Sequence, residues 1–125
     1  MESPYGLVQI VNCLHDKVTV QLENCSDPNW RMKDLTPFQV DATTGRVETS
    51  QLIYYRDASD TTKGPYFAQT TNITVYVGQD QQKVYVIEIP QDSIPTGTDK
   101  DVQLYLFKDK IIQTNTVTSE VKEYE

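Results

Sequence analysis

The fold is decided by two neighbouring stretches, Asn72-Ile73-Thr74-Val75-Tyr76-Val77 and Val84-Tyr85-Val86-Ile87-Glu88-Ile89, separated by a short polar break. Apolar and polar residues alternate along them. A half-buried strand requires this period of two, because successive side chains point to opposite faces of a sheet. The pattern predicts two paired strands, with Ile73 and Val75 in the core and Tyr76 facing outward.

Similar stretches extend through the whole chain, and polar turns rich in Asp, Asn, Pro and Gly separate them. No segment shows the 3.6-residue period of a helix. About eight strands at this spacing are typical of an all-β, antiparallel β-sandwich, either jelly-roll-like or immunoglobulin-like. The length of 125 residues predicts a single domain over 1–125. The charged segment 119–125 is expected to be a frayed tail.

Two cysteines bear on the compartment. We expect 7–13 and 18–25 to form a hairpin through a turn over 14–17, with Cys13 and Cys25 at its opposite ends. The two would then be too far apart for a disulfide, and free thiols favour a reducing compartment. Two glycosylation sequons, at Asn24 and Asn72, favour secretion instead. No signal peptide is visible, so the localisation stays open between the cytosol and a mature secreted domain with an added Met.

The charge excludes one class of partner. A net charge of −7, with the eleven basic residues scattered, argues against nucleic acid, which requires clustered Lys and Arg. No apolar run approaches the ~20 residues of a transmembrane helix, so we expect no transmembrane segment.

Catalytic motifs are missing from the sequence. There is one histidine, His15, and the five glycines form no phosphate-binding loop. A Cys13–His15 pair lacks an orienting partner and an oxyanion donor. The sequence therefore predicts a protein that is not an enzyme and has no cofactor. Calcium is the one ion worth weighing, because the loops around Asp57–Asp60 and Asp99–Asp101 offer oxygen ligands.

The aromatic residues carry the binding hypothesis. Tyrosine and tryptophan present a broad apolar ring with a polar tip, which suits recognition of sugars or proteins. Tyr54 and Tyr55 are adjacent, so one of them must face outward. Trp30 is either the anchor of a site or a plug that closes the core, and the alternative for the tyrosines is packing across strands. The predicted ligand-binding residues are Trp30, Tyr54, Tyr55, Asp57, Asp60 and Tyr66.

Three function classes follow from these observations. The first is a non-catalytic β-sandwich binding module that recognises carbohydrate or a protein partner through aromatic residues and long polar loops. The second is a self-assembling structural or coat protein, which would be a homo-oligomer. The third is a membrane-active, toxin-like β protein.

Overall fold

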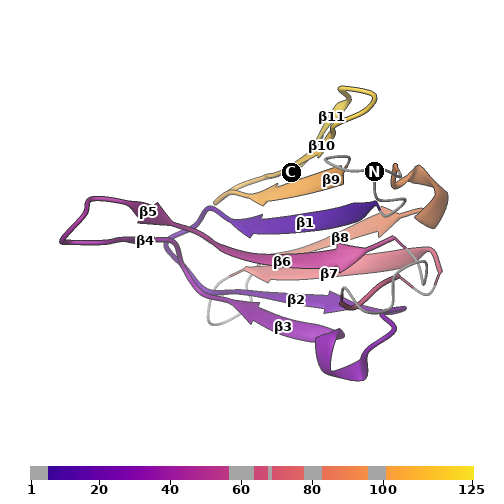
Figure 1. Cartoon of the computed structure of the whole chain (residues 1–125), viewed down its shortest axis with the longest axis horizontal. Helices are drawn as coiled ribbons and strands as arrows, with labels where there is room; N and C mark the ends of the chain where they lie inside the picture. Colours follow the sequence, from indigo (N-terminus) through magenta and orange to yellow (C-terminus); the bar gives the residue numbers. More distant parts are fainter. Residues whose placement is uncertain (1–5, 57–63, 68, 78–82, 96–100) are drawn as a thin grey trace, which may run out of the picture.

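The computed structural model describes residues 6–56, 64–67, 69–77, 83–95 and 101–125. Within them the protein is all-β, and two main sheets pack face to face as a sandwich (Figure 1). This confirms the predicted fold class. The described residues form eleven strands rather than about eight, because several are short edge or arm strands.

The first sheet has the strand order β11-β10-β9-β1-β6. Its strands are β1 (Leu7–Asn12), β6 (Ser50–Tyr55), β9 (Asp101–Leu106), β10 (Ile111–Asn115) and β11 (Val121–Tyr124). The pairing of β1 with β9 is parallel, and the other pairings of this sheet are antiparallel. The sheet is therefore mixed, whereas the sequence predicted antiparallel pairing throughout.

The second sheet has the order β3-β2-β7-β8 and is antiparallel throughout. It consists of β2 (Val18–Leu22), β3 (Met32–Leu35), β7 (Thr71–Val77) and β8 (Lys83–Ile89). Ile73 and Val75 are fully buried, and Tyr76 faces outward. The facing predicted from the alternation is confirmed, as is the β7–β8 hairpin.

The core lies between the two sheets and is made of Val, Ile and Leu from both, with Tyr54 and Phe67 as its largest aromatic side chains. These residue types fit a pleated surface well. Inward residues of β1 and β9, such as Ile10 and Leu104, are fully buried against those of β2 and β7.

The predicted hairpin between 7–13 and 18–25 is wrong. β1 and β2 belong to different sheets, because the chain crosses the sandwich between them. Asn12 holds this crossing: its side chain is fully buried and its Nδ2 donates to the carbonyl oxygens of Asp16, Leu35 and Thr36 at 3.0, 3.2 and 3.0 Å. Its Oδ1 accepts from the Leu14 N–H at 2.9 Å. A buried amide with this many partners fixes a turn of the backbone that alternation alone cannot reveal.

Both cysteines are nevertheless free thiols, as predicted. The reason differs from the expected one. Cys13 follows the last residue of β1 in the first sheet, whereas Cys25 follows β2 in the second sheet.

The expected frayed tail is also corrected. Val121–Tyr124 forms β11 and pairs with β10 at the edge of the first sheet. The connecting turn is fixed by Asn115, whose Oδ1 accepts from the N–H groups of Val117 and Thr118 at 3.0 and 3.1 Å. Charged residues are common on an exposed edge strand, so a charged sequence did not exclude a strand here.

A short hairpin arm extends away from the sandwich at the left of Figure 1. It consists of β4 (Gln39–Val40), β5 (Val47–Glu48) and the turn between them. Asp41 organises the turn by accepting from the N–H groups of Thr43 and Thr44 at 2.7 and 3.0 Å. The hydrogen bonds from Thr44 and then Thr43 lower the pKa of the Asp41 carboxyl.

Candidate functional site

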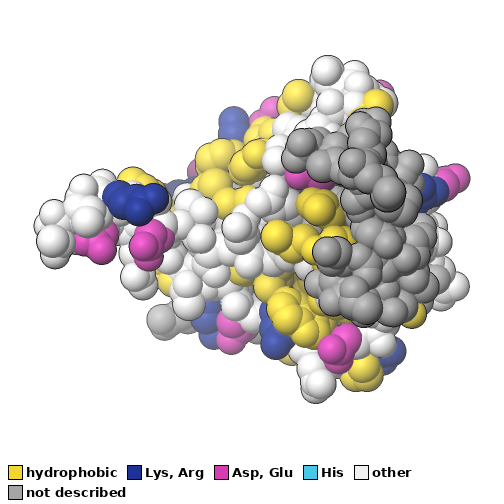
Figure 2. All heavy atoms as spheres, viewed as in Figure 1, with side chains coloured by type: hydrophobic (Ala, Val, Ile, Leu, Met, Phe, Trp, Pro, Cys, Tyr) yellow, Lys and Arg dark blue, Asp and Glu magenta, His cyan; other side chains and the backbone are white. Residues whose placement is uncertain are grey.

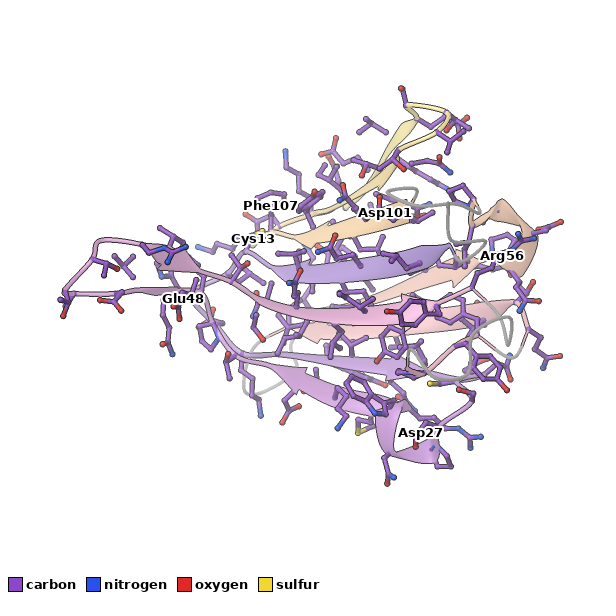
Figure 3. The ribbon with its side chains drawn as sticks, in the orientation of Figure 1. Cys13, Asp27, Glu48, Arg56, Asp101 and Phe107 are labelled. Atoms are coloured by element: carbon purple, nitrogen blue, oxygen red, sulfur yellow. The ribbon has the colours of Figure 1, made fainter. Side chains whose placement is uncertain are left out.

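A hollow of about 720 Å³ opens beside β6, at the edge of the first sheet. Three of the predicted aromatic residues, Trp30, Tyr55 and Tyr66, lie around it. Figure 2 shows hydrophobic side chains exposed on this face between β6 and β3. Asp27, another residue of the lining, is labelled at the lower right of Figure 3. The remaining lining residues are Ser26, Asp27, Gln51, Ile53, Gly64 and Pro65.

The segment 65–67 forms one wall of this hollow and joins the two sheets. On one side it pairs with β6: the Tyr55 N–H donates to the Pro65 carbonyl at 2.8 Å, and the Phe67 N–H donates to the Tyr55 carbonyl at 2.9 Å. On the other side the Ser26 N–H donates to the Tyr66 carbonyl at 2.9 Å, and the Tyr66 N–H donates to the Ser26 Oγ at 3.0 Å. These backbone bonds place Tyr66 beside Tyr55 at the hollow.

Trp30 ends the short 3₁₀ helix η1 (Pro28–Trp30), which Asp27 caps by accepting from the Asn29 N–H. Its ring is half-buried and packs edge-on against the Tyr54 ring, with the centroids 6.2 Å apart at 89°. The Lys33 ammonium lies 4.7 Å from the centroid of the Trp30 ring. Trp30 therefore packs against the core and also lines the hollow.

Tyr54, predicted as a ligand-binding residue, does not line the hollow. Its side chain is fully buried, and its hydroxyl donates to the Trp30 carbonyl at 3.0 Å. Burial raises the pKa of the Tyr54 hydroxyl far above its usual value. Tyr55, the next residue on β6, faces outward, as one of the pair must. Asp57 and Asp60 lie outside the described residues.

The sequence analysis did not select four residues of the lining, Ser26, Asp27, Gln51 and Ile53. Ser26 and Asp27 belong to a polar turn, and Gln51 and Ile53 to a strand, so no motif marks them in the sequence. Gly64 has a φ of +149°, and a Cβ there would approach the Tyr55 ring to 3.3 Å. A residue with a side chain would be strained at that φ, and its Cβ would press on the Tyr55 ring.

A second hollow of about 530 Å³ lies at the opposite end of the first sheet, where Figure 3 shows Cys13 and Phe107. Its lining also includes His15, whose ring packs on Phe38 with the centroids 4.2 Å apart. Burial raises the pKa of the Cys13 thiol, which keeps it protonated and weakly nucleophilic near neutral pH.

For metal ions, the described residues contain no group of three or more His, Cys, Asp or Glu side chains placed to hold one. Of the loops weighed for calcium, 57–60 and 99–100 lie outside the described residues. Asp101 begins β9.

Comparison with known proteins gave no relatives: no protein-family model matches the sequence, and neither the curated proteins nor the solved structures include a match. Among the described residues, no helix has the length and apolar character needed to cross a membrane.

Proposed function

We propose that this protein is a non-catalytic binding module that recognises a carbohydrate or a protein partner through the hollow beside β6. The observation that carries the proposal is the convergence of Trp30, Tyr55 and Tyr66 on one concave surface, although they come from three separate segments of the chain. Exposed aromatic rings around a hollow supply most of the contact energy in many binding sites, at a low entropic cost.

The test is a Trp30→Ala variant, with Phe107→Ala as the matched control. Phe107 is an exposed aromatic residue that lines the second hollow, so its loss removes a similar apolar surface elsewhere. We expect Trp30→Ala to abolish binding on a glycan array and to a random peptide library, and Phe107→Ala to leave it intact. The free energy of unfolding should fall by less than the ~3–5 kcal/mol lost when a fully buried aromatic is truncated, because Trp30 is only half-buried.

Two results together would contradict the proposal: Trp30→Ala loses more stability than expected for a half-buried residue, and a well-folded Tyr66→Ala variant still binds. Trp30 would then act only as a part of the core, and the proposed site would have no anchor. Equal losses of binding in the Trp30 and Phe107 variants would show that the hollow beside β6 has no special role.

A second candidate function, self-assembly as a structural or coat subunit, is favoured by the hairpin arm. Its two paired valines, Val40 and Val47, are 58% and 61% exposed, and the arm extends away from the sandwich (Figure 1). A two-stranded hairpin is marginally stable by itself in water, so packing against a neighbouring molecule would stabilise it. Sedimentation of the wild type without added ligand tests this: an oligomer that dissociates in a Val40→Thr, Val47→Thr variant supports assembly, and a wild-type monomer at high concentration excludes it.

A further inference from the structure

Resting on the proposed function, we infer the chemical class of the partner: an extended peptide segment of another protein, which adds to the edge of β6 as a further strand. The edge-facing backbone of Gln51 and Ile53 supplies the hydrogen bonds, and the hollow at Trp30 receives an apolar side chain of the peptide. Strand addition of this kind takes its affinity from main-chain bonds and its specificity from pockets for alternate side chains.

The direction of the β6 backbone groups follows from its hydrogen bonds. Tyr55 uses both its N–H and its carbonyl on the side away from β1, toward Pro65 and Phe67. Arg56 points its N–H the other way, to the Gly6 carbonyl at 2.9 Å. Because these directions alternate along an antiparallel strand, the N–H and carbonyl groups of Ile53 and Gln51 also point away from β1.

Those four groups lie at an edge of the sheet. β6 is the last strand of the first sheet, and within the described residues no backbone hydrogen bond reaches Gln51 or Ile53 from that side. Both residues also line the hollow, so a strand paired with them would lie beside it. An unpaired strand edge is a template for pairing with another chain.

Another segment of the chain already pairs with this edge of β6 at Tyr55, the next edge-facing residue after Ile53. Tyr66 forms a parallel bridge with Tyr55, in which the segment 65–67 lies beside β6 as a very short strand. A bound peptide would continue this pairing along Ile53 and Gln51. The edge is therefore adjacent to an existing strand pairing, with the same geometry.

The edge of β6 favours a peptide over a sugar. The N–H and carbonyl groups of Gln51 and Ile53 are spaced to match the main chain of an extended peptide. Three polar side chains of the lining already hold one hydrogen bond each within the protein: Ser26 accepts from the Tyr66 N–H, Asp27 accepts from the Asn29 N–H, and the Gln51 amide accepts from the Gln9 amide.

The negative charge of the protein indicates which residues the peptide should contain. The protein has a net charge of −7, and the one charged residue among those that line the hollow is Asp27, within the described part of the chain. Complementary charge speeds association and disfavours wrong partners. We therefore expect the peptide to combine an aromatic or aliphatic residue with Lys or Arg.

The experiment selects peptides from a random displayed library with the wild-type protein, in parallel with a glycan array. Selected peptides are then resynthesised with a single backbone N-methyl group at each position in turn, which removes one N–H donor without touching the protein. Strand addition predicts a period-two result: N-methylation at alternate positions should weaken binding about tenfold or more, and at the positions between them much less.

A matched protein pair completes the test. Ile53→Pro removes an N–H that faces the edge of β6 and should abolish peptide binding. Val121→Pro removes an N–H that faces the open edge of β11, away from the site, because the Asn115 N–H donates to the Glu120 carbonyl and the directions alternate from there; it should leave binding intact. Melting curves establish that both variants fold. Peptides whose binding shows no period-two pattern would overturn strand addition. Binding of glycans alone, lost in Trp30→Ala, would overturn this inference while the proposed function stands. If neither array yields a binder that depends on Trp30, the proposed function falls as well.

Discussion

Replacement of Asn12, the last residue of β1, by alanine should strongly destabilise the protein. Asn12 is fully buried and its side chain contacts four backbone groups at 2.9–3.2 Å. Two amide hydrogens and one oxygen correspond to three hydrogen bonds, each with a net contribution of about 1 kcal/mol. The Leu14 N–H, buried and left without its acceptor, adds about 1 kcal/mol or more.

The expected loss is therefore about 3–5 kcal/mol, out of a total stability of ~5–15 kcal/mol. For a domain of this size it corresponds to a fall in Tm of roughly 10–20 °C. Urea unfolding followed by circular dichroism measures the change. Asn115→Ala is the control, because the Asn115 side chain likewise bonds the backbone: its Oδ1 accepts from two N–H groups of a turn, but in contact with solvent. It should cost no more than about 1 kcal/mol. If the two variants unfold at the same urea concentration, Asn12 does not hold the crossing between the sheets.

Three further predictions follow from burial and hydrogen bonding. Val75→Asp should unfold the protein or nearly so, because an unpaired buried carboxylate costs several kcal/mol, whereas Thr74→Asp on the outer face should be mild; equal melting temperatures would refute the facing of β7. Cys13 and Cys25 should react slowly with a thiol reagent in the folded protein, because burial raises the pKa of both, and both should react fully after unfolding; a mass two protons lighter, with no reactive thiol, would refute this. The pKa of the Asp41 carboxyl is lowered in the folded arm, so the ionised carboxylate stabilises the fold at pH values above its unfolded pKa of about 3.8. This stabilisation is lost as the pH falls through the folded pKa. An NMR titration midpoint at or above 3.8 would contradict the lowered pKa.

The sequence predicted the alternating strands such as β7 and β8, and which of their side chains face inward, because alternation reports directly on the two faces of a sheet. It did not predict β3 or β11, which lack that alternation. It also predicted the local pairing of β7 with β8, where a short polar break leaves few alternatives. It did not predict that β1 and β2 separate into different sheets. Alternation says nothing about which strand is the neighbour, and the buried contacts of Asn12 with residues 35 and 36 are distant in sequence.

In the candidate site, too, the sequence predicted the facing of side chains but not which strand edges are open. The sequence indicated that either Tyr54 or Tyr55 must face outward, and the polar residue Gln51, on the same face as Tyr55, was the signal that could have decided between them. It also selected Trp30 and Tyr66, which line the hollow. The open backbone of Gln51 and Ile53 was beyond prediction, since it depends on β6 being the last strand of its sheet.

The most direct test of the account is the fluorescence of Trp30 during titration with a selected peptide. Trp30 is the single tryptophan of the chain, and it is half-buried at the hollow, so its emission reports on this one place. The account predicts a saturable blue shift with the same midpoint as binding, absent when the peptide is N-methylated at an edge-pairing position. A peptide that binds at saturation and leaves the Trp30 emission unchanged would contradict it.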